Sequence, residues 1–249
     1  MKTWYSCQAT LIGHRESNDD ALHLSFWKAW RCYHLLTLCD GIGSLKGSGE
    51  CAKNVVAIAE AIARTFIEQR DSKRPFSKHE CECLAFANHL TQGLSILEGS
   101  PNQGTTFALA IFSYRSALVA WAGDSRIYAL MNDGTLQQLT EDHQNTKGEI
   151  TKFIRGDGIV MGGLEVRQFS MNNIVAIIGT SDGIHEACST EELRRFTLYC
   201  MAKRFTDSET LSVELLRFLQ DNLSDNATFG LLYKTMNITF LNKWAELRI

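Results

Sequence analysis

Blocks of apolar residues separated by polar turns run along the chain, and their spacing predicts which blocks are helices and which are strands. Helices are indicated where apolar residues return every three or four positions, as at Ala52, Val55 and Ala59. Strands are indicated where short apolar runs end at turn residues such as Asn132-Asp133-Gly134. The predicted helices cover residues 48–69, 77–97, 190–203 and 208–221. The predicted strands cover residues 3–12, 21–27, 33–39, 104–112, 117–122, 126–131, 135–139, 165–170, 174–180 and 227–233.

The order of these elements predicts their arrangement. The four short strands between residues 104 and 139 are joined by turns, which indicates an antiparallel meander. The first two helices are neighbours in the chain and are predicted to cover one sheet face as an antiparallel pair. The glycine-rich segment 144–163 is predicted to be a mobile excursion with one short helix. Since no repeat or linker is evident, we expect one domain over 1–249, with a short flap at about 144–168 and a C-terminal tail at 236–249.

Composition narrows the class of protein. The chain has 249 residues, of which 45% are hydrophobic and 21% charged, as in ordinary globular proteins. The net charge is −3 and no basic stripe interleaved with aromatic residues occurs, which argues against a nucleic-acid partner. No apolar run has the length of a signal or membrane-spanning segment, so we expect a cytoplasmic monomer that binds no membrane.

The eight cysteines are scattered through apolar contexts, which favours reduced thiols over a disulfide framework. Cys81 and Cys83, with His79 and His89 nearby, offer the residue types of a zinc site. Their spacing matches no usual set of zinc ligands, and the surrounding apolar residues are typical of a helix face. The helical interpretation is therefore preferred.

Acidic residues stand where predicted strands meet turns. The apolar run from Leu35 ends at Asp40-Gly41, and the run from Ile174 is followed by Asp182-Gly183. A single Asp-Gly pair is common in turns, because the carboxylate bonds the local backbone. Several acids brought together repel one another unless a cation neutralises them, and oxygen ligands suit Mg²⁺ or Mn²⁺. The candidate acids are Asp20, Asp40, Asp124, Asp182 and Asp225.

Arg15 lies in the polar turn before Asp20. A lone arginine is usually a surface cation. Beside a metal cluster it would instead be suited to bind phosphate with two parallel hydrogen bonds. Arg15 is therefore a candidate phosphate-binding residue.

Two other segments of the sequence fit known catalytic patterns. Gly179 to Gly183 fits the G-x-S-x-G nucleophile elbow, but the only later histidine is His185, too close in the chain to be presented from a separate strand. Cys188 to Arg194 fits the C-x5-R loop of cysteine phosphatases, but two glutamates lie where phosphate would bind. The same residues instead form a capping box, which predicts the start of a helix.

Seven short motifs follow one another in a fixed order along residues 9–233. Together they resemble those of the metal-dependent protein serine/threonine phosphatase family PP2C (PPM) in its bacterial form. The motifs are Arg15–Asp20, Asp40–Ser44 with Gly49-Glu50, Gly104-Thr105-Thr106, Gly123–Arg126, Leu139–His143, Ser181–Gly183 and Asp225–Thr228.

This resemblance implies an α+β fold, a four-layer α-β-β-α sandwich of two antiparallel sheets flanked by helix pairs. It also implies two Mn²⁺ or Mg²⁺ ions at one sheet edge, with metal-activated water as the nucleophile. Asp40 would bridge both ions, the carbonyl of Gly41 would bind one, and Asp182 and Asp225 would complete the other. Asp19 and Asp20 would hold metal-bound waters, Asp124 with Asp182 would hold a weaker third ion, and Arg15 would bind the phosphoryl group.

The chain departs from the family pattern at a few positions. Ile42 stands where some members have a candidate general acid, Ser44 and Leu45 replace Gly and His, and the flap is short. No metal-ligand position is lost. The resemblance implies hydrolysis of phosphoserine or phosphothreonine on a protein that a cognate serine/threonine kinase has phosphorylated. The alternative is a regulatory or binding module of the same fold with little turnover.

Overall fold

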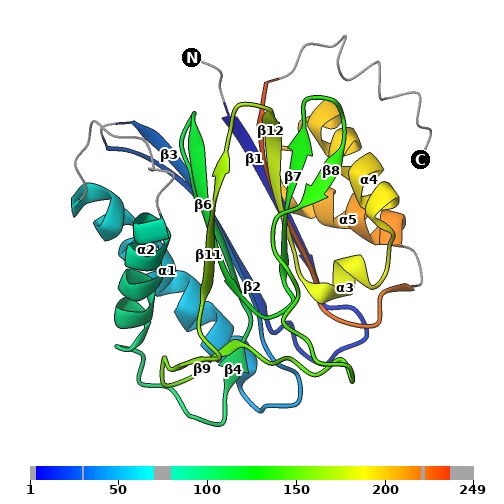
Figure 1. Cartoon of the computed structure of the whole chain (residues 1–249). Coiled ribbons are helices and arrows are strands. Elements are labelled where there is room, and N and C mark those ends of the chain that lie inside the picture. Colours follow the sequence, from blue (N-terminus) through cyan, green and yellow to red (C-terminus); the bar gives the residue numbers. More distant parts are fainter. Residues whose placement is uncertain (1–3, 30, 70–79, 220–221, 236–249) are drawn as a thin grey trace.

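The computed structural model describes residues 4–29, 31–69, 80–219 and 222–235. Two antiparallel five-stranded sheets lie face to face, and helices cover their outer faces (Figure 1). The first sheet has the order β1 (Trp4–Leu11), β13 (Ala227–Lys234), β12 (Ile174–Thr180), β7 (Arg126–Met131) and β8 (Leu136–Gln138). The second has the order β11 (Glu165–Ser170), β6 (Ser116–Ala122), β5 (Phe107–Phe112), β3 (Cys32–Asp40) and β2 (Asp20–Lys28).

The helices form two pairs on opposite sides of the molecule (Figure 1). On the second sheet lie α1 (Ser48–Gln69) and α2 (Glu80–Leu94), and on the first lie α4 (Thr190–Lys203) and α5 (Ser208–Leu219). A short helix, α3 (Asp182–His185), follows β12. The four layers confirm the predicted α-β-β-α sandwich. Among the helices that the structure describes, none combines the length and hydropathy that a membrane crossing requires.

Three apolar cores hold the layers together, because each central strand is buried on both faces. On β3, Leu35 packs toward the helices, whereas Leu36 packs into the core between the two sheets. This alternation explains why β5, β6 and β12 are continuous apolar runs in the sequence.

The predicted meander is wrong at one connection. β5 pairs with β6 and β7 pairs with β8, but β6 and β7 belong to different sheets. The chain crosses between the sheets at residues 123–125, where Gly123 has a φ of 111°. A Cβ atom there would lie 2.7 Å from the Cβ of Thr106, so glycine permits the crossing.

The strand predicted over 104–112 is also divided. β4 (Gly104–Thr105) belongs to a separate three-stranded sheet with β9 (Phe153–Arg155) and β10 (Val160–Met161). Within 144–163 the structure therefore has two strands and no helix, contrary to the prediction. Asp157-Gly158 lies in the turn that joins them, where the amide of Arg155 donates to the carbonyl of Ile159.

The bounds of α1, β7, β11, β12 and α4 are as predicted, and those of the other elements differ from the predictions by a few residues. α2 ends at Leu94 rather than residue 97, because the Ser95 hydroxyl donates to the carbonyl of Gln92 and a tighter turn follows. The prediction that this helix begins at Ser77, the predicted end of α5 at residue 221 and the tail at 236–249 lie outside the described residues.

His34 on β3 gives the fold a predicted dependence on pH. Its ring contacts the rings of Trp4, Phe26 and Phe112, with centroids 5.2, 5.0 and 5.3 Å away, and burial lowers its pKa to about 4. An unfolded histidine has a pKa of about 6.5. Below that pH this histidine therefore binds a proton in the unfolded chain but stays neutral in the folded chain. The free energy of unfolding falls as the pH falls toward 4.

We expect His34→Phe to remove this loss, which amounts to about 2 kcal/mol at pH 5. Urea unfolding of both proteins at pH 7, 6 and 5 measures it. The other acids and histidines are common to both proteins, so their contributions cancel in the difference. Parallel stability curves for the two proteins would contradict the expectation.

Candidate active site

Two of the candidate acids are brought together by strand register. Asp20 is the first residue of β2, Asp40 is the last residue of β3, and the antiparallel pairing sets them directly opposite each other. Like charges at such a pair of positions destabilise a sheet. The register is set by the apolar residues of both strands, so the fold forces these two carboxyl groups into proximity.

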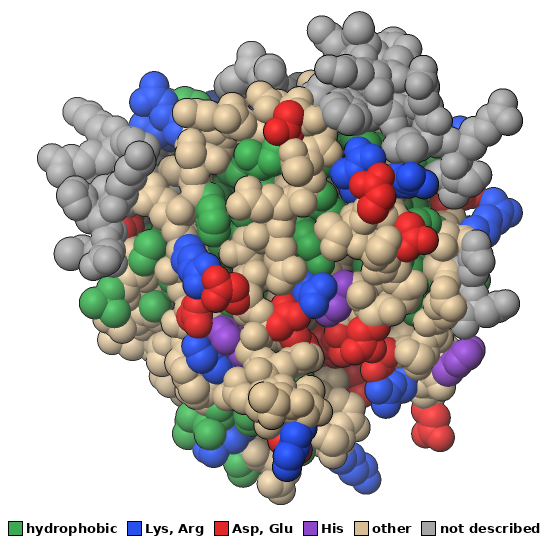
Figure 2. Space-filling view, turned by 45° about the vertical axis from the view of Figure 1, so that its right-hand side comes forward, with side chains coloured by type: hydrophobic (Ala, Val, Ile, Leu, Met, Phe, Trp, Pro, Cys, Tyr) green, Lys and Arg blue, Asp and Glu red, His purple; other side chains and the backbone are tan. Residues whose placement is uncertain are grey.

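Two more acids, Asp182 and Asp124, lie close to Asp40. Asp182 begins α3, one residue after the end of β12, and its charge raises the pKa of Asp40. Asp124 lies where the chain crosses between the sheets, and its charge acts on both Asp40 and Asp182. Acidic side chains gather in the lower half of the face seen in Figure 2.

The electrostatics of this cluster are unfavourable without a cation. Loss of solvation is the largest cause that raises the pKa of Asp20, Asp40 and Asp124 above the usual range, and it raises that of Asp182 to about 7. Repulsion from neighbouring carboxylates adds to this effect at Asp40 and Asp182. Such groups are costly to ionise unless positive charge is supplied.

The donor chemistry of the cluster fits a hard divalent cation. The Oδ1 atoms of Asp20, Asp124 and Asp182 are buried and have no hydrogen-bond partner among the described residues. Oxygen ligands of this kind are those that Mg²⁺ and Mn²⁺ prefer. In the present arrangement the described His, Cys, Asp and Glu side chains form no ready-made group of three around an ion. The fit therefore rests on the buried, unpartnered oxygens.

The fifth candidate acid, Asp225, forms an ion pair with Arg15, the candidate phosphate-binding residue. Arg15 donates from Nε to Oδ1 of Asp225 at 2.7 Å and from Nη2 to Oδ2 of the same carboxylate. This bidentate pair raises the pKa of Arg15, and the charges of Asp182 and Asp40 add to the effect. The guanidinium is half-exposed, with 49% of its side chain accessible. Arg15 thus lies at the rim of the cluster and neutralises Asp225.

Asp19 and Gly41 are joined by a backbone hydrogen bond. The amide of Gly41 donates to the carbonyl of Asp19 at 3.1 Å, and a Cβ atom on Gly41 would lie 2.8 Å from that oxygen. The Asp19 carboxylate accepts from the Ser17 hydroxyl at 2.9 Å. The ligand roles of the Gly41 carbonyl and the Asp19 carboxylate stay predictions.

Sequence reasoning missed three polar residues that organise the site. Asn226 donates to the carbonyls of Ile12 and Ser17 and accepts from the amide of Asp19, so it ties the Arg15 turn to Asp225. Ser181 donates to Asp20 Oδ2 at 2.8 Å. Gln144 donates to Asp124 Oδ2 at 2.6 Å. Asn226 could have been suspected from its place in the Asp225 motif, but no local pattern marks Gln144.

The structure removes the esterase alternative. The Ser181 hydroxyl donates to Asp20 and accepts from the backbone amide of Thr228, and among the described residues no hydrogen bond joins it to the ring of His185. Burial is the main cause that lowers the pKa of His185 to about 4. A serine bonded to a carboxyl group instead of a histidine lacks the base that a nucleophile elbow requires.

The cysteine-phosphatase alternative fails as well. Burial raises the pKa of Cys188 to about 12, so its thiol stays protonated at neutral pH. Arg194 pairs with Glu191, and Ser189 and Glu192 form the predicted capping box of α4. Of the zinc candidates, His79 and the side chain of Cys81 lie outside the described residues, and Cys83 forms no disulfide within the described part of the chain.

Comparison with known proteins adds independent information. The model of the family described as protein phosphatase 2C matches residues 7–220. No curated protein gives a match. Many solved structures share the fold.

Three of these structures illustrate the likeness. A bacterial serine phosphatase superposes with a TM-score of 0.69 at 22% identity, over 94% of this chain and 99% of that chain. The serine/threonine phosphatase Stp1 from Staphylococcus aureus gives 0.67 at 21% identity, over 93% and 95%. The catalytic domain of the serine/threonine protein phosphatase PstP, solved with two manganese ions, gives 0.63 at 19% identity, over 95% and 100%. At these identities the structures establish a shared fold.

Proposed function

The chain belongs to the protein phosphatase 2C family, and from that premise we propose that it hydrolyses phosphoserine or phosphothreonine on proteins with the help of divalent cations. The observation that carries this proposal is the convergence of Asp20, Asp40, Asp124 and Asp182 from both sheets on one acidic cluster. The manganese ions of the similar PstP domain support the choice of cation. The substrate would be a cytoplasmic protein phosphorylated by a cognate kinase.

Each candidate acid has a proposed role toward the cations. Two Mn²⁺ or Mg²⁺ ions would be held by Asp40, Asp182, Asp225 and the carbonyl of Gly41, a third by Asp124 with Asp182, and Asp19 and Asp20 would orient water. When bound, such ions supply an activated water and offset the charge of the phosphoryl group. The chain's own carboxylates would fix the positions of the ions and of the water.

Arg15 would bind the phosphoryl oxygens through its planar fork, which matches a phosphate as well as a carboxylate. In the structure this fork holds Asp225. A cation that recruits Asp225 would leave the guanidinium available to phosphate. Ser181, through its bond to Asp20 Oδ2, would keep that carboxyl group turned into the site.

The same Arg15–Asp225 pair favours a second candidate function, a regulatory or binding module with little turnover, because each residue neutralises the other. An assay with a generic phosphate ester at saturating Mn²⁺ separates the two candidates. Turnover supports the enzyme, and binding of the ester without turnover supports the module.

Metal removal is the direct test of the proposed mechanism. We expect EDTA to abolish turnover of a phosphothreonine peptide, excess Mn²⁺ to restore it, and the thiol reagent iodoacetamide to leave it unchanged. Burial raises the pKa of Cys51 to about 11 and that of Cys188 to about 12, so neither is a thiolate at neutral pH. Phosphate release that persists in EDTA would exclude the proposal.

A further inference from the structure

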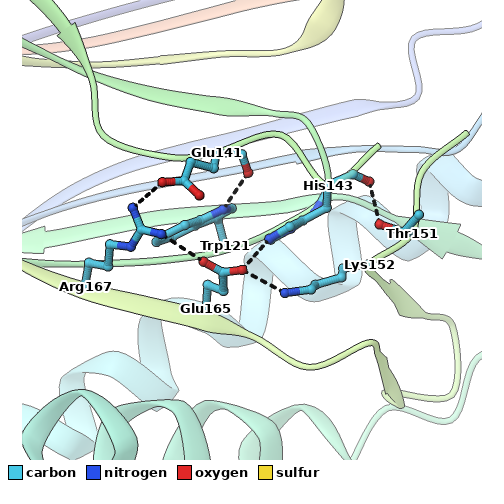
Figure 3. Close-up of polar contacts among 8 residues, drawn as sticks. Trp121, Glu141, His143, Thr151, Lys152, Glu165 and Arg167 are labelled. Carbon is cyan, nitrogen blue, oxygen red and sulfur yellow. Dashed lines mark hydrogen bonds and ion pairs between the residues drawn. The ribbon is translucent and has the colours of Figure 1, made fainter. Parts of the chain in front are cut away.

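A set of polar contacts is centred on His143, whose ring points toward Glu165 (Figure 3). The backbone amide of His143 donates to the carbonyl of Gly123 at 3.0 Å. In return, the amide of Gly123 donates to Nδ1 of the His143 ring at 3.1 Å. The ring is 8% exposed and lies nearly parallel to Trp121, with centroids 6.0 Å apart. Both backbone polar groups of Gly123 are thus bound by this single residue.

The partners of His143 define its tautomer. Because Nδ1 accepts from Gly123, the ring proton belongs on Nε2, which donates to Glu165 Oε1 at 2.9 Å. Lys152 donates to the same oxygen at 2.8 Å. Burial alone would raise the pKa of Glu165, but the hydrogen bonds from Lys152 and His143 lower it. The ring therefore joins the crossing between the sheets to a carboxylate on β11.

The backbone of His143 also binds the segment that contains Thr151. Its carbonyl accepts from the amide of Thr151 at 2.7 Å and from the hydroxyl of Thr151 at 3.0 Å. The next residue, Gln144, donates to Asp124 Oδ2. Residues 143 and 144 thus carry hydrogen bonds to both Gly123 and Asp124, while Thr151 and Lys152 attach the segment that leads to β9.

We propose that His143 is a positioning residue, which couples cation binding at Asp124 to the segment 144–164 by holding the Gly123 peptide in place. The inference rests on the proposed function, because it assumes that Asp124 binds a cation. Asp124 follows Gly123 directly, so rotation of that peptide displaces the carboxylate. A ligand group must be held to within about 0.5 Å of its working position. Loss of such supporting contacts typically costs about 10–100-fold in metal affinity or activity.

Two substitutions separate the two ring contacts. In His143→Asn, the side-chain carbonyl oxygen takes the place of Nδ1 and still accepts from Gly123, but the reach to Glu165 is lost. In His143→Gln, the longer side chain carries an amide nitrogen to Glu165, but the acceptor for Gly123 is lost. His23→Gln is the matched control, because it alters a similar pair, His23 with Glu60 at 2.6 Å, that joins β2 to α1.

The experiment measures the Mn²⁺ concentration that gives half of the maximal rise in unfolding temperature, without substrate, alongside peptide turnover. We expect His143→Gln to need about tenfold more Mn²⁺, whereas His143→Asn and His23→Gln stay within about twofold of the unaltered chain. A His143→Gln protein with unaltered Mn²⁺ dependence would overturn the proposal. So would equal losses in the Asn and Gln variants, since these indicate a general structural role.

Hydrogen exchange on the unaltered chain provides a test that does not depend on whether the variants fold. Coupling through His143 predicts that Mn²⁺ slows exchange of both the Gly123 and the Thr151 amides. If Mn²⁺ leaves both amides unchanged, the inference is wrong. Failure of the proposed function would be seen separately, as a chain whose Gly123 amide responds to Mn²⁺ but which releases no phosphate.

Discussion

We expect Asp40→Asn to lower phosphopeptide turnover by about 10³-fold and, at the same time, to raise the unfolding temperature of the metal-free protein. The loss of activity follows because a neutral amide would hold divalent cations more weakly than the carboxylate proposed to bind them, and the charge stabilisation that such cations would supply is worth several kcal/mol. The gain in stability follows because Asp40 is close to the charges of Asp20, Asp182 and Asp124. Relief of that repulsion by about 1 kcal/mol corresponds to a rise of about 2–4 °C. Active sites commonly trade stability for function in this way.

Thermal unfolding in EDTA and in Mn²⁺, together with turnover of a phosphothreonine peptide, measures both effects. Asp207→Asn is a suitable control, because Asp207 is an exposed acid that accepts from the amide of Thr210, and asparagine keeps that bond. The control is expected to change neither quantity appreciably. Asp40→Asn with turnover near that of the unaltered chain, or with a lower unfolding temperature in EDTA, would show that Asp40 is an ordinary turn residue.

The second large effect is expected at Arg15. Arg15→Ala should lower turnover by about 10²–10³-fold, the usual cost of removing one group that stabilises transition-state charge. The substitution should not weaken Mn²⁺ binding, because it frees Asp225 from the ion pair in which Nε and Nη2 of Arg15 donate to its carboxylate. Arg15→Lys should recover only part of the turnover, since a lysine cannot bind two oxygens in parallel.

Turnover as a function of peptide concentration, and the Mn²⁺ dependence of unfolding, distinguish these outcomes. Arg217→Ala serves as the control, because Arg217 forms an exposed ion pair with Glu214 on α5. If Arg15→Ala binds Mn²⁺ more weakly than the unaltered chain, then Arg15 supports Asp225 and the proposed phosphate-binding role is wrong. If Arg15→Ala keeps full turnover, the ion pair has no part in catalysis.

Local patterns in the sequence were sufficient for most of the fold. The helix over residues 190–203 matches α4 at both ends, because its capping box and its apolar spacing are contained within the helix itself. The resemblance identified the layers correctly. The sequence missed the passage of β6 and β7 into different sheets, because the turn at Gly123 looks the same locally whichever sheet follows. It also missed β9 and β10, since β9 pairs with β4, which lies about 50 residues earlier in the chain, and β10 pairs with β9.

For the site, the sequence by itself determined which candidate residues carry carboxylate groups and that these residues stand at the ends of apolar strands. Tertiary structure alone decided their partners. Arg15 and Asp225 are 210 positions apart, and Ser181 and Asp20 are 161 apart. The contacts of Gln144 with Asp124 and of His143 with Gly123 likewise depend on how the crossing chain returns. Hydrophobic periodicity records which face of an element is buried, but a polar pair forms only where two separately folded elements bring its members within about 3 Å.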